Sequence, residues 1–189
     1  MKKLSLLALI EASFFAAFAL ILDLLPSIKL GPWISISFAM VPIFILAFRW
    51  GFKVSFLAGF IWGLLQFAMG DAYFLTLIQF LIEYFIAFAF IGFAGLFFKP
   101  IQAEFLKENK KKALGWVVIA IFVGSLARYF WHFIAGIIFW GSYAPDGMSP
   151  IAYSLVVNGG AMLGSAILCA IVVAALLWNA PRLIKVRIN

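Results

Sequence analysis

The sequence predicts an all-α integral membrane protein with six transmembrane helices, formed as a single domain over residues 1–189. Hydrophobic residues make up 67% of the chain and charged residues only 11%, about half the charged fraction of a typical soluble domain. The mean hydropathy is +1.16. The apolar residues gather in runs near the ~20 residues that a membrane-spanning helix needs. These runs lack the period-two alternation of a closed barrel, the other fold that satisfies backbone polar groups in lipid.

The first predicted helix covers residues 4–25 and is interrupted by one charge, Glu11. A cleaved signal peptide is the competing interpretation, with Ala17 and Ala19 as a small-residue cleavage site. Because Glu11 breaks the apolar region and five more spans follow, a retained first helix is the better prediction. Small residues recur on this helix at helical spacing and allow close approach of another helix, from this bundle or from a partner.

Five further runs predict the remaining helices, and short polar stretches separate them. The second and third runs are short, and the segment RWGFK lies between them. The segment FKPIQAEFLKENKKK follows the fourth run and predicts a connector with a short surface helix that leads into the fifth. The segment GSYAPDG precedes the sixth. These runs are residues 33–48, 54–70, 74–97, 113–139 and 152–178.

Basic residues fall almost entirely on one side of this six-span arrangement, which predicts a cytoplasmic location for that side and for both termini. The opposite side has only Lys29, and Arg128 lies inside a span. The net charge of +7 therefore indicates membrane orientation, with anionic lipid as a secondary partner. Nucleic acid is not a predicted partner, since no soluble basic face exists. The basic residues on the cytoplasmic side are Lys2, Lys3, Arg49, Lys53, Lys99, Lys107, Lys110, Lys111, Lys112, Arg182, Lys185 and Arg187.

The stretch RYFWHFIAGIIFW in the fifth helix combines a guanidinium, the only histidine and several rings. His132, Gly136 and Trp140 share one helical face at i, i+4 and i+8. A glycine between two flat rings leaves a slot for a planar ligand. At ~1.5 Å rise per residue, His132 lies about 12 Å and Arg128 about 18 Å below the outer end of the helix. Ionisable residues at such depth are costly and usually functional.

Glu83 reaches a similar depth from the fourth helix, about 14 Å from its outer end, and shares a helical face with Gln79. A carboxylate there could accept from an amino group or attract a cation. Tyr and Trp rings can also hold a cation over their faces. The sequence therefore predicts a pocket that opens outward and has a closed inner end. The other polar and aromatic residues expected in this outer zone are Trp33, Tyr73, Tyr84, Tyr153 and Asn158.

Structural alternatives exist for these residues. The aromatic residues at helix ends also fit an ordinary interfacial belt. Glu83 and Arg128 also fit an interhelical ion pair with a structural role, and His132 fits a histidine satisfied within the bundle. One histidine and one cysteine, Cys169, form no metal-ligand cluster and no internal disulfide. No nucleophile with a positioned base and no paired carboxylates appear, so the sequence gives little support to catalysis.

The chain resembles the thiamine-specific substrate-binding subunit, or S component, of energy-coupling factor (ECF) vitamin transporters. The resemblance covers nearly the whole chain. It is most specific in FRWGFKVSFLAGFIWGLLQFAMGDAYFL, QFLIEYFIA, RYFWHFIAGIIFWGSYA and AYSLVVNG. It implies a six-helix S-component fold in the bacterial cell membrane, with thiamine as the transported ligand and no other cofactor. It also implies a coupling-subunit contact at Ser13 and Ala17. The implied thiamine-binding residues are Trp33, Tyr73, Glu83, Tyr84, His132, Gly136, Trp140, Tyr153 and Asn158.

By the same resemblance the chain is not an enzyme. It would dock onto a transmembrane coupling subunit and two ATPase subunits, and it contains no phosphate-binding G-x-x-x-x-G-K-[ST] loop of its own. The leading hypothesis is high-affinity capture of extracellular thiamine. The rivals are an S component for another flat vitamin, an intramembrane enzyme that uses Glu83 and His132, and a structural protein without a ligand. Because thiamine is cationic, Arg128 is expected to be neutralised by an acidic partner or turned away from the ligand.

Overall fold

The computed structural model describes residues 4–30, 34–70 and 72–185. The predicted pocket residue Trp33 and the basic residues Lys2, Lys3 and Arg187 lie outside these described residues. Six helical segments of ten residues or more are present in the described part, as predicted, and four of them are long and apolar enough to cross a membrane. Those four are α1 (Leu6–Asp23), the composite segment Leu77–Leu106, α7 (Lys110–Phe139) and α8 (Pro150–Asn179).

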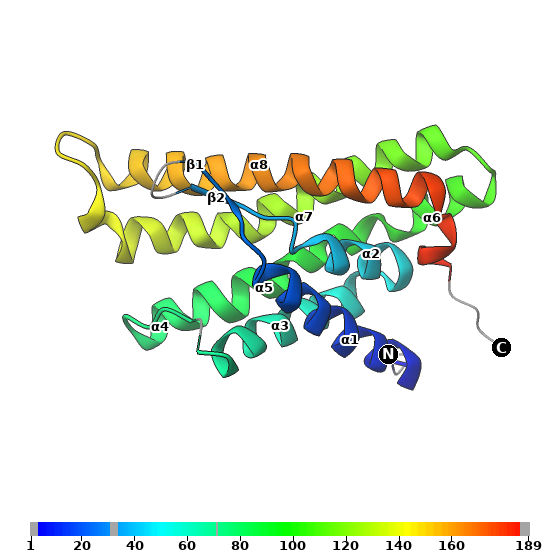
Figure 1. Cartoon of the computed structure of the whole chain (residues 1–189), viewed down its shortest axis with the longest axis horizontal. Helices are drawn as coiled ribbons and strands as arrows, with labels where there is room; N and C mark the ends of the chain where they lie inside the picture. Colours follow the sequence, from blue (N-terminus) through cyan, green and yellow to red (C-terminus); the bar gives the residue numbers. More distant parts are fainter. Residues whose placement is uncertain (1–3, 31–33, 71, 186–189) are drawn as a thin grey trace.

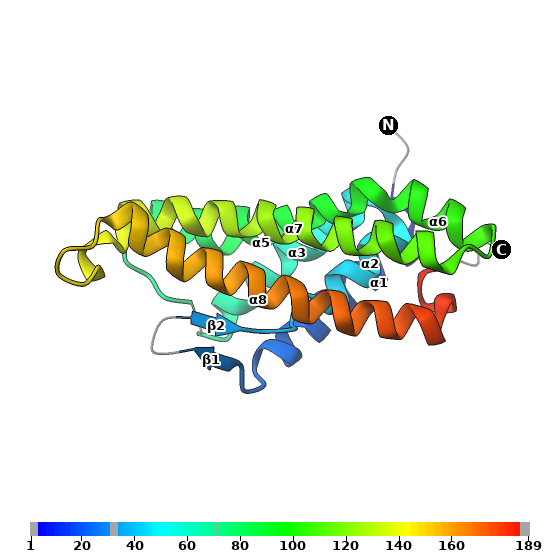
Figure 2. The same ribbon diagram turned by 90° about the horizontal axis from the view of Figure 1, so that it is seen from above.

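The second predicted helix is shorter than expected. Residues 33–48 were expected to be helical, but α2 spans Val41–Trp50, and the preceding residues form the strand β2 (Ile34–Ile36). This strand pairs antiparallel with β1 (Ile28–Leu30). The local sequence Ile-Ser-Ile alternates with period two, which favours a strand over a helix. Figure 2 shows the hairpin beside α8, where Ile34 and Ile36 lie against glycines of that helix.

Helix α2 lies at the centre of the bundle. All eight residues from Val41 to Phe48 are buried. A helix that is apolar on every side is stable only when it is surrounded, and here α3 (Phe52–Ala68), α1 and the composite segment pack around it. Its ten residues are too few to cross a bilayer, so α2 is a core element of the bundle rather than a lipid-facing span.

The fourth span changes its helical geometry along its length. It runs through α4 (Leu77–Phe80), the π-helix η1 (Leu81–Ile86), α5 (Ala87–Phe90), the 3₁₀-helix η2 (Ile91–Phe97) and α6 (Phe98–Leu106). The connector after residue 97 was predicted to form a surface helix that leads into the fifth span. Instead, α6 continues the fourth span, and a turn at residues 107–109 precedes α7.

Two glycines on α3 place its backbone directly against the fourth span. A Cβ atom at Gly63 would overlap the carbonyl oxygen of Tyr84, and one at Gly59 would overlap that of Phe88. Small residues allow such close approach between membrane helices. Since Tyr84 lies in η1, this contact fixes the part of the chain that also carries Glu83.

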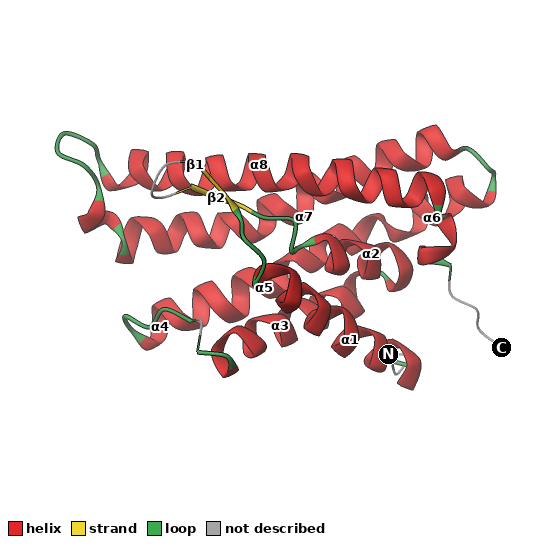
Figure 3. Ribbon diagram, in the orientation of Figure 1, coloured by secondary structure: helices red, strands yellow, loops and turns green. Residues whose placement is uncertain are grey.

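The long helices α7 and α8 run side by side (Figure 1). The loop between them, the β1–β2 hairpin and α4 lie at one end of the bundle, and α6 lies at the other (Figures 1 and 3). On α1, Ala12 and Ala16 are buried in the bundle, whereas Ser13 and Ala17 are exposed. The two small-residue pairs predicted on this helix therefore have different surroundings, and only one packs within the chain.

Arg49 connects the beginning of the chain to its end. Its Nε and Nη2 atoms donate to the Glu11 carboxylate at 2.5 and 2.7 Å, and Trp50 Nε1 donates to the same carboxylate at 2.6 Å. Arg49 Nη1 also donates to the carbonyl oxygens of Leu183 and Lys185. The inner half of α1 and the C-terminal 3₁₀-helix η4 (Pro181–Ile184) therefore lie at the same end of the bundle, in agreement with the predicted topology.

A Gly63→Ala change is expected to lower the free energy of unfolding by about 1–3 kcal/mol, because the added methyl group overpacks the α3 contact. A matched change, Gly115→Ala, meets no atom within 4 Å and is expected to stabilise α7 slightly through helix propensity. Thermal unfolding of both variants in the same detergent checks this. Equal melting temperatures for the two variants would contradict the described contact.

Candidate functional site

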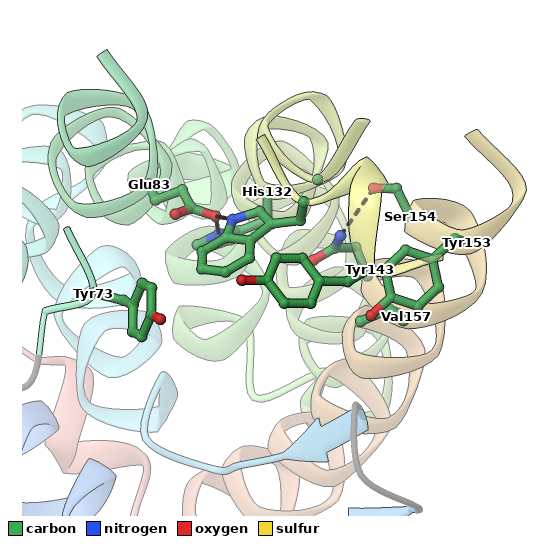
Figure 4. A pocket seen from close by; sticks show the side chains of 10 residues that line it. Tyr73, Glu83, His132, Tyr143, Tyr153, Ser154 and Val157 are labelled. Atoms are coloured by element: carbon green, nitrogen blue, oxygen red, sulfur yellow. Dashed lines mark hydrogen bonds and ion pairs between the residues drawn. The ribbon is translucent and has the colours of Figure 1, made fainter. Parts of the chain in front are cut away.

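A cavity of about 470 Å³ lies where α7, α8 and the fourth span meet. Figure 4 shows that its side chains converge from separate elements, with Tyr73 across the cavity from Tyr143. Seven of the nine residues predicted to bind a ligand line it. Of the other two, Tyr84 lines an adjoining cavity of about 310 Å³, and Trp33 lies outside the described residues. The lining residues are Tyr73, Glu83, His132, Gly136, Trp140, Tyr143, Tyr153, Ser154, Val157 and Asn158.

One face of α7 forms a wall of the cavity, as the i, i+4, i+8 spacing predicts. His132, Gly136 and Trp140 all line it. A Cβ atom at Gly136 would overlap Ser154 Oγ and approach Asn158 Nδ2 to 2.9 Å. The glycine therefore brings α8 against α7 in addition to leaving room beside the two rings.

Glu83 is held in place by groups from α7 and from its own span. Trp140 Nε1 donates to Glu83 Oε1 at 3.1 Å, and His132 Nδ1 lies 3.9 Å from the same oxygen. Gln79 Nε2 donates to Oε2, as their shared helical face predicts. The Glu83 side chain is 13% exposed. It sits in η1, and π-helical turns occur often at functional sites.

A polar pair on α8 lies across the cavity from Glu83. Asn158 Nδ2 donates to Ser154 Oγ at 3.1 Å, and Ser154 Oγ donates to the carbonyl oxygen of Phe133 at 2.8 Å. Ser154 thus orients Asn158 and joins it to α7. The neighbouring Tyr153 is 7% exposed and adds an aromatic side to the cavity.

Three aromatic residues form a partial cage near the end of the bundle. The ring centroids of Tyr73 and Trp140 are 5.2 Å apart, and those of Trp140 and Tyr143 are 5.6 Å apart. Tyr73 and Tyr143 are exposed, so this side of the cavity is open. Aromatic faces arranged in this way attract a flat or cationic group.

Sequence reasoning missed three lining residues: Tyr143, Ser154 and Val157. Ser154 precedes Asn158 by four positions, and helical spacing alone would have placed both on one face. Tyr143 follows Trp140 by three positions and ends the short 3₁₀-helix η3 (Gly141–Tyr143), which lies beyond the predicted fifth span. Val157 carries no polar group, and no signal in a single sequence separates it from other apolar residues.

The surroundings of Arg128 differ from the expectation of an acidic partner. Its guanidinium carbon lies 4.1 Å from the ring centroid of Phe88 and 4.9 Å from that of Trp62. Its Nε atom faces His132 Nε2 at 3.5 Å. Within the described residues Arg128 forms no ion pair, so the alternative of an Arg128–Glu83 pair is wrong. Aromatic faces compensate the cation instead.

Arg128 lines two adjoining cavities, of about 250 and 310 Å³, and is absent from the lining of the main one. His132 lines all three. In the larger of these two cavities, Arg128 shares the lining with Tyr73 and Trp140 of the aromatic cage. The prediction that this cation turns away from a bound ligand stays a prediction.

The described residues contain no group of three or more His, Cys, Asp or Glu that could hold a metal ion. The cavity instead combines one carboxylate, one imidazole, one amide and several rings. Such a lining suits reversible binding of a flat molecule that carries hydrogen-bond donors. Fold and site together define a helical membrane protein with a small-molecule cavity at one end of its bundle.

Residues 9–185 match the family described as thiamine transporter protein (Thia_YuaJ), and the chain belongs to this family. It is 41% identical over 182 residues to the thiamine transporter ThiT of Bacillus subtilis, covering 95% of both chains. It is 40% identical over 181 residues to ThiT of Lacticaseibacillus paracasei, covering 94% of this chain and 90% of the relative. A solved structure of ThiT from Listeria monocytogenes superposes with a TM-score of 0.92 at 39% identity, covering 96% of this chain and 98% of the other.

Proposed function

We propose that this chain is the thiamine-binding S component of an ECF transporter and captures extracellular thiamine in the cavity described above. The observation that carries the proposal is the position of Glu83. A carboxylate lies in a cavity whose other lining residues are mostly rings, in a chain that belongs to the thiamine transporter family. Thiamine is flat and permanently cationic, and its pyrimidine ring carries an amino group. The cavity offers a complementary group for each of these properties.

The proposed binding roles follow from the chemistry of each side chain. Glu83 accepts from the amino group of the pyrimidine, and Asn158 provides a second hydrogen-bonding group. The His132 and Trp140 rings stack against the ligand, and Gly136 leaves space between them. Tyr73, Tyr153 and the predicted residues Trp33 and Tyr84 complete the aromatic surroundings. The cavity volume of about 470 Å³ is within the range of small-molecule sites.

The proposed partners follow from the S-component assignment. The chain would dock onto a transmembrane coupling subunit, and two ATPase subunits would supply the energy. Ser13 and Ala17 are exposed on α1, which supports a docking role for that face. We place the protein in the bacterial cell membrane as a single six-helix domain, with thiamine as its transported ligand and no further cofactor.

Titration of the purified chain with thiamine, followed by tryptophan fluorescence, tests the proposal directly. Trp140 lies in the cavity, so bound thiamine is expected to quench part of the emission. Riboflavin and biotin are the comparison ligands and are expected to bind far more weakly. Absence of quenching by thiamine, or equal quenching by all three vitamins, would overturn the assignment in favour of another vitamin or a protein without a ligand.

A Glu83→Gln change is expected to weaken thiamine binding by about tenfold to a hundredfold, because a hydrogen bond to a charged group is replaced by a neutral one. The matched control is Glu104→Gln. Glu104 is buried and pairs with Lys107 and Lys112 at the cytoplasmic end, and its loss is expected to leave the Kd within about twofold. Isothermal titration of both variants checks this, and unchanged affinity in Glu83→Gln would remove Glu83 from the site.

A further inference from the structure

Gln79 lies beside the main cavity without lining it. It is the third residue of α4 and is fully buried, with 0% of its surface exposed. Its side-chain Nε2 donates to Glu83 Oε2 and to the carbonyl oxygen of Tyr73, the latter at 3.1 Å. Its Oε1 accepts from the backbone N–H of Leu75 at 3.0 Å. A single amide thus contacts both the carboxylate of the site and the loop that carries Tyr73.

The hydrogen-bonding capacity of this amide is used almost entirely by these neighbours. A glutamine side chain has two N–H donors and one acceptor oxygen. One donor faces a carboxylate, the other faces a carbonyl oxygen, and the acceptor faces an N–H group. A flipped amide would place its oxygen against two other acceptors. The network therefore permits one orientation of the side chain.

A second set of contacts connects the loop that carries Tyr73 to Glu83. Tyr84 accepts a hydrogen bond from the Tyr73 N–H at 2.7 Å. The Tyr73 ring lies 5.2 Å from the Trp140 ring, and Trp140 in turn donates to Glu83. Gln79, Glu83, Trp140 and Tyr73 thus form a closed ring of contacts around one side of the cavity. Movement of any one of these four residues changes the position of the others.

Helix formation does not explain this arrangement. The first turn of α4 already has a cap, because Thr76 Oγ1 accepts from the Gln79 backbone N–H at 3.1 Å. An apolar side chain at position 79 would serve the start of the helix equally well. A buried amide carries a desolvation cost that only its hydrogen bonds repay, and each of these three bonds leads to residues 73–75 or to Glu83.

We propose that Gln79 is a positioning residue that holds the Glu83 carboxylate and the Tyr73 loop in a fixed orientation relative to each other, so that both face one ligand. The proposal rests on the proposed function, since it assigns Gln79 a role in recognising the amino group of thiamine through Glu83. Gln79 itself does not touch the ligand. Its amide donates to Oε2 of Glu83 and so sets the direction in which the remaining lone pairs of the carboxylate can accept from that amino group.

The test compares Gln79→Met with Gln102→Met in the full chain. Gln102 is a matched control, because its Nε2 also donates to two carbonyl oxygens, those of Phe48 and Ile184, at the opposite end of the bundle. For each variant, the Kd is measured for thiamine and for oxythiamine, in which an oxygen replaces the pyrimidine amino group. Thermal unfolding of both variants reports any general loss of stability.

Gln79→Met is expected to weaken thiamine binding by about tenfold or more, as for a lost hydrogen bond to a charged group. It is also expected to reduce the preference for thiamine over oxythiamine toward that of Glu83→Gln. Gln102→Met is expected to keep both the affinity and the preference, even if its melting temperature falls equally. A purely structural role would weaken both ligands together and leave their ratio unchanged.

Three results would overturn the proposal while leaving thiamine binding intact. They are an unchanged affinity in Gln79→Met, an unchanged ligand preference in that variant, or a parent chain that binds both ligands equally. A parent chain that fails to bind thiamine at all would instead overturn the proposed function, and the role of Gln79 with it. The parent titration therefore separates the two failures.

Discussion

The arrangement of the site depends on one carboxylate held inside an apolar bundle. A buried charge is tolerated only when other groups supply the hydrogen bonds that water would give. Glu83 obtains them from Trp140 and Gln79, with His132 close by. These partners come from α7 and α4, so the need to satisfy one side chain determines how two spans meet. A ligand with an amino group would share in the same network.

Close packing of helix backbones determines the position of the Glu83 side chain. Gly63 lets α3 touch the carbonyl oxygen of Tyr84, the residue next to Glu83. Gly136 lets α7 approach Ser154, which holds Asn158. At both places the absence of a side chain allows two helices to come together beside the cavity. The dimensions of the site therefore depend on close helix contacts at these two glycines.

Much of this could be predicted from the sequence. The lengths of the apolar runs predicted the helices. Helical spacing and the estimated depth of each residue together placed His132, Trp140, Glu83 and Asn158 at a common level in the membrane. The hairpin was missed, because a count of apolar residues from position 33 onward does not distinguish a β-strand from the first turns of a helix. The environment of Arg128 was also missed. Its compensation by rings requires knowing which faces of three helices meet, and one-dimensional periodicity does not contain that information.

The same limit applies to the changes of helical geometry in the fourth span and to Tyr143, which ends a 3₁₀-helix beyond the predicted fifth span. Both arise from tertiary contacts rather than from local preference.

The most direct measurement of the central claim is a structure of the chain with thiamine bound. It should place the pyrimidine amino group within hydrogen-bond distance of Glu83, with the ligand beside His132 and Trp140. Thiamine bound away from Glu83 would contradict the account.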